Sequence, residues 1–208
     1  MQALLLDFNG TLSDDEPLLC RIFMELFADE GKPLTEEEYY EGLAGLADRE
    51  IVQVWLGRDD PALVERKMER YTELADGSTV TQEARDAVAY AAGRASVAVV
   101  SGSARAEIEP VLAKTGLLES VTAIVASDDI RRSKPDPEGY LIALHLLGVP
   151  AAQAAAVEDS EAGVKAAKAA GLYCAAVTTT LQAERLSEAD EIADRFDRDL
   201  IAGLLSRS

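Results

Sequence analysis

Short apolar runs alternate with longer segments of helical pattern along most of this chain, and this alternation constrains its fold more than any other feature. Five such runs carry no charged residue: Ala3–Leu6, Ser96–Val100, Ala123–Ala126, Ala154–Val157 and Cys174–Val177. A strand that is apolar on both sides is typical of a parallel sheet whose two faces are covered by helices. We therefore predict an α/β fold.

Several of the intervening segments have helical patterns that stop close to a glycine, which readily adopts the left-handed conformation that ends many helices. These segments are Ala104–Lys114, Glu138–Leu147 and Glu161–Ala170. A further helix is expected over Thr81–Arg94. Strands and helices are therefore expected to alternate from this helix to the fifth apolar run.

The region that follows the first strand breaks the alternation, because it shows no strand pattern. It reads as four helices, over Pro17–Glu30, Thr35–Gly42, Asp48–Leu56 and Pro61–Ala75. An insert at this point leaves the core at the carboxyl edge of the sheet, where it can cover a ligand site. We predict a Rossmann-like parallel-sheet core formed by residues 1–14 and 78–208, with a helical cap formed by residues 15–77.

The composition limits the possible partners. The chain has 208 residues, of which 48% are hydrophobic, and this is enough for one domain with a small insert. Its 38 acidic and 20 basic residues give a formal net charge of −18. Such a surface argues against nucleic acid and anionic membranes as partners, because it offers few cations to phosphates. An anionic small-molecule substrate would need a locally positive pocket.

The cysteines and the first residues bear on the cellular location. Cys20 and Cys174 lie far apart in apolar segments, so we predict two buried, reduced thiols. The N-terminal segment lacks the basic flank and the apolar length of a signal peptide or a membrane span. We therefore expect a cytoplasmic protein, and the sequence leaves open whether it is a monomer or a dimer.

Polar residues follow the predicted strands at the points where the strands end. Asp7 follows the first strand, Ser101-Gly102-Ser103 the second, and Glu158-Asp159 the fourth, while Lys134 lies beyond the third. The carboxyl ends of parallel strands meet at one edge of a sheet, so these groups are expected to converge.

The converging groups suit phosphoryl transfer to an aspartate. The carboxylates of Asp7, Glu158 and Asp159 are the hard oxygen ligands that Mg²⁺ prefers. Ser101 and the amides after it lie at a helix N-terminus, which favours a phosphate. A cation at Lys134 can neutralise the phosphoryl oxygens, and the metal offsets their repulsion of the nucleophile. The residues therefore predict an aspartyl-phosphate mechanism.

Four segments resemble, in order and spacing, the motifs of the haloacid dehalogenase superfamily. They are Asp7–Asp14, Val100–Ser103, Ser133–Pro137 and Val157–Gly163. The likeness covers nearly the whole chain and is closest to capped phosphatases of the beta-phosphoglucomutase-like branch. Asp15-Glu16-Pro17 and Gly45–Glu50 also resemble that branch, at its core-to-cap crossing and its cap substrate loop.

The resemblance implies roles for individual residues. Asp7 would be the nucleophile and a Mg²⁺ ligand, the backbone carbonyl of Asn9 a second ligand, and Asp159 with Glu158 would complete the set. Lys134 would balance charge.

The resemblance also implies a set of substrate-binding residues. Ser101 and Gly102 would bind the phosphoryl group, and Arg105 would reach a phosphate. Arg49 would contact the distal part of a small phosphorylated metabolite, although a surface ion pair is an equal alternative for this residue.

Asn9 departs from the family pattern, which has an acid–base aspartate at this position. An amide cannot shuttle a proton, and general acid–base catalysis is worth about 10²–10⁴-fold in rate. The first hypothesis is a Mg²⁺-dependent phosphohydrolase slowed or restricted by Asn9. The alternatives are a sugar-phosphate mutase and a pseudoenzyme that binds Mg²⁺ and a phosphorylated ligand. Asp14, Asp15 and Glu16 are possible substitutes for the missing acid.

Overall fold

The computed structural model of this chain describes residues 1–207. Its described residues form a six-stranded parallel sheet with the strand order β3-β2-β1-β4-β5-β6. The strands are β1 (Ala3–Leu6), β2 (Ser96–Val100), β3 (Ala123–Val125), β4 (Ala154–Glu158), β5 (Tyr173–Val177) and β6 (Glu191–Ala193). The predicted α/β fold is confirmed, and the five predicted strands are present with ends within one residue. The sequence reasoning missed β6.

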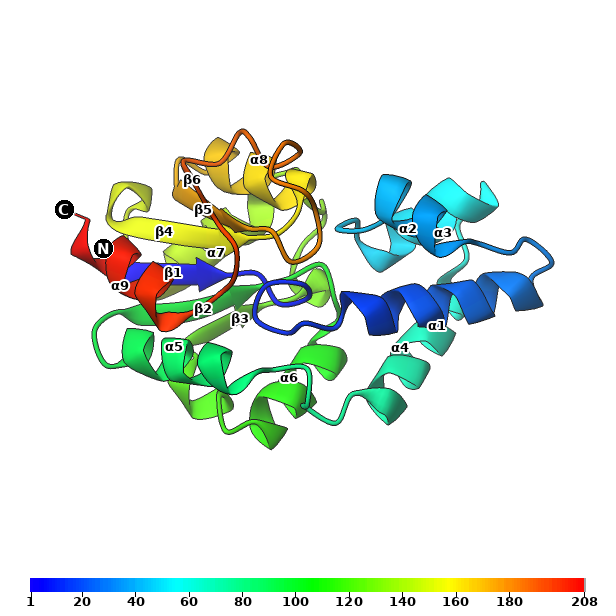
Figure 1. The fold of residues 1–208 in the computed structure, drawn as a ribbon, viewed down its shortest axis with the longest axis horizontal. Coiled ribbons are helices and arrows are strands. Elements are labelled where there is room, and N and C mark those ends of the chain that lie inside the picture. Colours follow the sequence, from blue (N-terminus) through cyan, green and yellow to red (C-terminus); the bar gives the residue numbers. More distant parts are fainter. Residues whose placement is uncertain (208) are drawn as a thin grey trace.

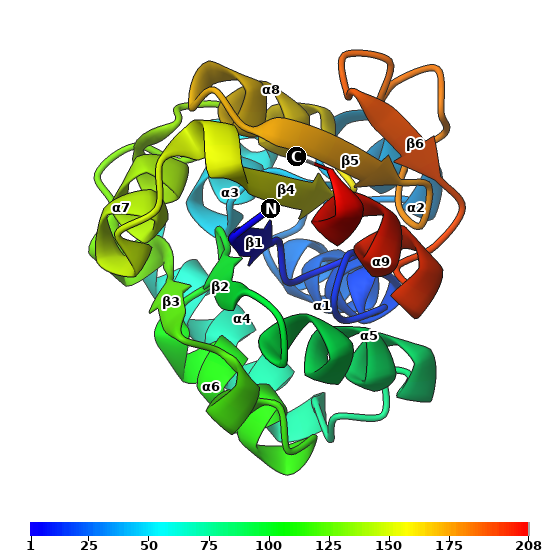
Figure 2. The same ribbon diagram turned by 90° about the vertical axis from the view of Figure 1, so that its left-hand side faces the viewer.

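Helices cover both faces of the sheet (Figure 2). One face carries α5 (Gln82–Ala92), α6 (Arg105–Lys114) and α9 (Arg198–Ser206), and the other carries α7 (Glu138–Leu147) and α8 (Glu161–Ala169). Alternate residues of β1 point to opposite faces: Leu4 and Leu6 join the first core cluster, and Leu5 joins the second. All three are fully buried, which explains why the strand is apolar throughout.

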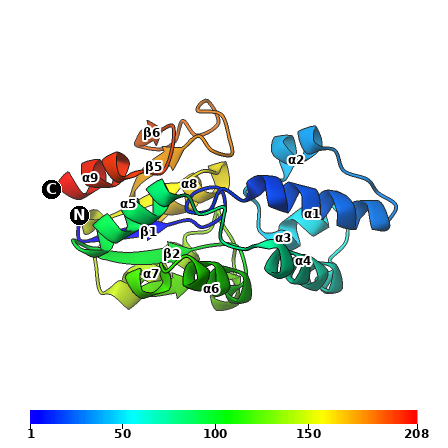
Figure 3. The same ribbon diagram turned by 60° about the horizontal axis from the view of Figure 1, so that its bottom comes forward.

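A four-helix insert follows β1 and lies beyond the carboxyl ends of the strands (Figures 1 and 3). It consists of α1 (Glu16–Asp29), α2 (Glu36–Gly42), α3 (Asp48–Leu56) and α4 (Pro61–Leu74), close to the four predicted segments. Aromatic rings hold it together, because Phe27 stacks on Phe23 at 5.5 Å and on Trp55 at 6.2 Å between centroids.

Two further expectations can be compared with the described residues. Cys20 and Cys174 are buried and unpaired, which confirms the prediction of free thiols. In residues 1–207 no helix is both long enough and apolar enough to cross a membrane.

A buried cation ties the insert to the core. Lys67 of α4 is fully buried, and its Nζ contacts Asp48 of α3 at 2.9 Å and Glu107 of α6 at 2.7 Å. Burial disfavours the charge of Lys67, but the two carboxylates outweigh this effect and raise its pKa. Insert and core thus share one desolvated charge cluster beside the strand ends.

We expect Lys67→Met to lower the free energy of unfolding by about 3–5 kcal/mol, because it leaves two buried carboxylates without their cation. Burial raises the pKa of Glu107, and removing Lys67 raises it further, so the deficit should shrink as the pH falls toward the ordinary value of a glutamate and Glu107 takes up a proton. Denaturant titration at several pH values measures it. Arg70→Met on the same helix removes a half-exposed pair with Glu25 and should cost about 1 kcal/mol or less. An equally small loss for Lys67→Met would contradict a structural role for the cluster.

Candidate active site

A tight turn after β1 places Asp7 at the edge of the sheet. Gly10 has a φ of 71°, and its amide donates to the carbonyl of Ser13 at 2.7 Å. A Cβ atom at Gly10 would lie 2.0 Å from Oδ2 of Asp159. Glycine is therefore required both for the left-handed backbone and for the close approach of this turn to β4.

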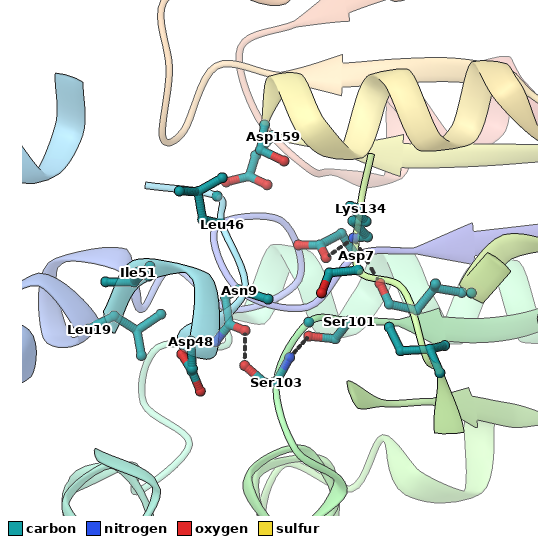
Figure 4. A pocket seen from close by; sticks show the side chains of 18 of the residues that line it. Asp7, Asn9, Leu19, Leu46, Asp48, Ile51, Ser101, Ser103, Lys134 and Asp159 are labelled. Atoms are coloured by element: carbon teal, nitrogen blue, oxygen red, sulfur yellow. Dashed lines mark hydrogen bonds and ion pairs between the residues drawn. The ribbon is translucent and has the colours of Figure 1, made fainter. Parts of the chain in front are cut away.

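Lys134 joins the ends of three neighbouring strands. Its Nζ lies 2.5 Å from Oδ1 of Asp7 and 2.6 Å from Oε1 of Glu158, and it donates to the carbonyl of Val100 at 3.0 Å (Figure 4). Burial disfavours the ammonium ion, but the charges of the two carboxylates raise the pKa of Lys134 overall. The lysine is therefore a fixed positive charge beside Asp7.

The structure brings together three buried carboxylates at this edge. Asp7, Glu158 and Asp159, here called the acidic triad, offer oxygen atoms within 4.8 Å of one another. Burial raises the pKa of Asp159, and the charges of Asp7 and Glu158 raise it further. The triad faces one lysine, and Oε2 of Glu158 is buried with no hydrogen-bond partner in the described residues. This excess of carboxylate oxygen fits a divalent cation such as Mg²⁺.

The turn after β2 presents polar groups to the same pocket. Ser101, Gly102 and Ser103 all line it. Oγ of Ser101 accepts from the amide of Ser103 at 3.1 Å, so the serine closes the turn before α6. The described residues provide no hydrogen-bond acceptor for the amide of Gly102. This turn can therefore offer the Ser101 hydroxyl and the Gly102 amide to an anion.

Asn9 is held in place at both ends of its amide group. Its Oδ1 accepts from the hydroxyl of Ser103 at 2.7 Å (Figure 4), and its Nδ2 donates to Oδ2 of Asp15 at 3.1 Å. Asp15 also accepts from the hydroxyl of Tyr71, and burial raises the pKa of Asp15 to about 6. The side chain of Asn9 is thus a fixed bridge between core and insert.

The structure does not bring Arg49 or Arg105 to the pocket, since neither lines it. Nε of Arg49 donates to Asp59 at 2.7 Å, on the exposed side of the insert. The guanidinium of Arg105 bonds to Glu109 at 3.1 Å and to Asp129 at 2.7 Å. Carboxylates of this chain therefore occupy both cations, and the surface ion pair is the alternative that the structure shows for Arg49.

The insert supplies a second wall of the pocket, and part of this wall comes from the segment Gly45–Glu50 that resembled a cap substrate loop. Leu19, Leu46 and Ile51 line it together with Glu16 and Asp48 (Figure 4). The backbone brings the insert close to the core here, because a Cβ on Gly45 would meet Ser160 at 2.4 Å. No local pattern in the sequence identifies which apolar residues of the insert, such as Leu19 and Ile51, face the strand ends.

The core supplies a second cation that was also missed. Arg132 lines the pocket and pairs with Asp136 at 3.2 Å. Its side chain is 69% exposed, so it lies at the rim.

A parallel α/β core with a helical insert over a buried, lysine-paired aspartate is the architecture of a class of hydrolases. The chain belongs to the haloacid dehalogenase-like hydrolase family, whose model matches residues 4–177. This confirms the resemblance drawn from the four sequence motifs.

One relative of known function is a phosphatase. A validoxylamine A 7'-phosphate phosphatase from Streptomyces hygroscopicus subsp. limoneus is 43% identical over 97 residues, which are 47% of this chain and 46% of that protein. The match thus spans less than half the length of that relative.

Solved structures match over nearly the whole chain. CbbY from Rhodobacter sphaeroides in complex with phosphate has a TM-score of 0.85 and 31% identity, covering 98% of this chain and 99% of that chain. A substituted form of CbbY in complex with xylulose-(1,5)bisphosphate has a TM-score of 0.85 and 32% identity, with the same coverage. A beta-phosphoglucomutase from Clostridium difficile shares the fold with a TM-score of 0.85 at 19% identity, covering 99% and 97% of the two chains.

Proposed function

We propose that this protein is a Mg²⁺-dependent phosphatase that hydrolyses a small phosphorylated metabolite through a phosphoryl group carried on Asp7. The observation that carries the proposal is the buried acidic triad, with Lys134 on Asp7, at the mouth of the Ser101–Ser103 turn. The names of the relatives support it, because they include a validoxylamine A 7'-phosphate phosphatase and a protein crystallised with phosphate and with xylulose-(1,5)bisphosphate.

In the proposed reaction each residue of the site has a separate role. The Gly102 amide and the Ser101 hydroxyl hold the phosphoryl oxygens, and a carboxylate oxygen of Asp7 attacks phosphorus as the bond to the leaving oxygen breaks. Burial raises the pKa of Asp7, and Lys134 opposes this effect by favouring the carboxylate; the lysine also neutralises charge on the phosphoryl group. A Mg²⁺ ion held by Asp7, Asp159, Glu158 and the Asn9 carbonyl would supply further neutralisation of that charge. Water then releases phosphate from Asp7.

The insert wall indicates the kind of leaving group. Leu19, Leu46 and Ile51 are apolar, and Asp48 is an acceptor. Among the residues that line the pocket, the cations are Lys134, which is bound to Asp7, and Arg132 at the rim. An uncharged leaving group with hydroxyls, such as a sugar, matches this wall better than one with further anionic groups.

One observation favours a second candidate function. Both ends of the Asn9 amide are engaged, so the position that usually carries the acid–base group is filled by a structural contact. A pseudoenzyme that binds a phosphorylated ligand without turnover would have this arrangement. A mutase is disfavoured, because it needs proton transfer in both directions at this point.

A metal-dependence assay separates these possibilities. We expect the protein to release p-nitrophenol from p-nitrophenyl phosphate only when Mg²⁺ is present. Product release should stop when excess EDTA is added and resume when Mg²⁺ is restored. Acetyl phosphate should behave in the same way, since neither leaving group depends on protonation by the protein. Binding of Mg²⁺ with no release of product from either compound would favour the pseudoenzyme.

A further inference from the structure

Glu16 occupies an unusual place among the carboxyl groups of the pocket. It begins α1, lines the pocket and is only 5% exposed. Its Oε1 accepts from the hydroxyl of Tyr39 at 2.8 Å, whereas the described residues provide no hydrogen bond to its Oε2. One oxygen of Glu16 is thus anchored and the other is free to meet a ligand.

The other carboxyl groups that line the pocket either form an ion pair or belong to the acidic triad. Asp7 pairs with Lys134, Asp48 with Lys67 and Asp136 with Arg132, and Asp159 belongs to the acidic triad. Glu16 has no ion pair with any described cation and lies outside the acidic triad, so it can gain and lose a proton without breaking a salt bridge or removing a ligand of the proposed metal site.

We infer that Glu16 is the proton donor and acceptor of this enzyme, in place of the group that Asn9 cannot supply. This inference rests on the proposed function. In the first step a carboxylate oxygen of Asp7 bonds to phosphorus, the bond from phosphorus to the leaving oxygen breaks, and that oxygen takes the proton of the neutral Glu16. In the second step the Glu16 carboxylate takes a proton from water, the oxygen of that water bonds to phosphorus, and the bond from phosphorus to Asp7 breaks. Glu16 ends protonated, as it began.

The surroundings of Glu16 suit both steps near neutral pH. Burial raises the pKa of Glu16 to about 7, and the charges of Asp15 and Asp7 raise it, while the Tyr39 hydrogen bond and Lys67 lower it. The charge of Glu16 in turn raises the pKa of Asp159, Cys20 and Tyr40. An acid whose pKa lies close to the working pH transfers a proton in both directions with the least penalty.

Glu16→Gln tests the inference, because glutamine keeps the shape and the Tyr39 contact but has no acidic proton. We expect kcat on β-glycerophosphate, an alkyl phosphate, to fall by about 10²-fold or more, while kcat on p-nitrophenyl phosphate changes by less than about 3-fold. Glu37→Gln, on the exposed surface of the same insert, is the matched control and should leave both rates unchanged. A purely structural role for Glu16 would lower both rates equally and would overturn the inference.

Two further variants keep the test decisive if Glu16→Gln folds poorly. Tyr39→Phe removes a hydrogen bond that stabilises the Glu16 carboxylate, so the alkaline limb of kcat/KM on β-glycerophosphate should move to higher pH. In an Asn9→Asp background, Glu16→Gln should cost much less than it does beside Asn9, because the aspartate restores an acid. An unmoved limb, or equal losses in the two backgrounds, would overturn the role of Glu16. Absence of phosphate release from either probe by the unsubstituted protein would instead overturn the proposed function.

Discussion

Replacing Asp7 with asparagine is expected to abolish turnover, with kcat falling on the order of 10⁴-fold or more on every phosphorylated substrate. The amide nitrogen and oxygen of asparagine are too weakly nucleophilic to attack phosphorus, and no other carboxylate of the acidic triad is paired with Lys134 in the same way: Glu158 also accepts from Tyr140. The loss should be the same for alkyl and aryl phosphates, because it removes the step that they share.

The fold should survive this substitution. Asp7 shares its Lys134 partner with Glu158, so the lysine keeps a carboxylate at 2.6 Å after the change. The change also relieves the repulsion of Asp7 with Asp159, whose pKa the Asp7 charge raises. We therefore expect a cooperative unfolding transition for Asp7→Asn, with a free energy of unfolding close to that of the unsubstituted protein.

Phosphate release and mass spectrometry check this expectation together. Acid-quenched unsubstituted protein should carry one added phosphoryl group during turnover of acetyl phosphate, and Asp7→Asn should carry none. Asp14→Asn is the matched control, because Asp14 is an exposed carboxylate a few residues along the same segment. Mg²⁺-dependent turnover retained by Asp7→Asn would contradict the nucleophile assignment.

The strands of the sheet were predictable because the pattern that identifies each of them lies within a few consecutive residues. Strand β1 is apolar at every position and β4 at its first four, and a run of four such residues is visible without knowing the partners. β6 lacks this property: it has three residues, and Ile192 at its centre is 40% exposed on the edge of the sheet. α9 did leave a signal, in the N-cap at Asp197 and the helical spacing of Leu200 and Leu204, and it was overlooked.

The site was predictable to the extent that topology places it. Asp7 and Asp159 follow parallel strands, so both lie at the carboxyl edge of the sheet for any conformation of the loops. The convergence of these two residues therefore followed from the strand order alone. The direction of a long side chain depends on partners that are distant in sequence. Arg105 donates a hydrogen bond to Asp129, which lies 24 residues away in the sequence, and no pattern near Arg105 predicts this partner.

Restoring a carboxyl group at position 9 is the second change with a large expected effect. We expect Asn9→Asp to raise kcat on β-glycerophosphate by at least about 10-fold, since general acid–base catalysis is worth about 10²–10⁴-fold and Glu16 already supplies part of it. The rate on p-nitrophenyl phosphate should change little, because its leaving group needs no proton. The ratio of the two rates therefore measures the effect and is insensitive to the fraction of active protein.

The contacts of Asn9 explain why the new carboxyl group would hold a proton. The Asn9 amide nitrogen lies 3.1 Å from Oδ2 of Asp15, so Asn9→Asp places a half-buried carboxyl group at hydrogen-bond distance from a buried one. Like charges this close cannot both ionise cheaply, and the pair should retain one proton up to a higher pH than an isolated aspartate would. The Ser103 hydroxyl can still donate to the other oxygen and hold the acid toward the pocket.

The same pair should make the variant less stable in alkaline solution, which gives a second readout. The folded-state pKa of the pair is raised above that of the unfolded chain, so the free energy of unfolding falls as the pH rises through the folded value. Asn9→Ala is the matched control: it loses both amide contacts, should not gain the rate on β-glycerophosphate, and should show only the smaller pH dependence that arises because Asp15 loses the hydrogen bond from Asn9 that lowers the pKa of Asp15. A rate on β-glycerophosphate unchanged in Asn9→Asp, together with the expected alkaline destabilisation, would show that the carboxyl group is in place and that proton transfer at this position does not limit the reaction.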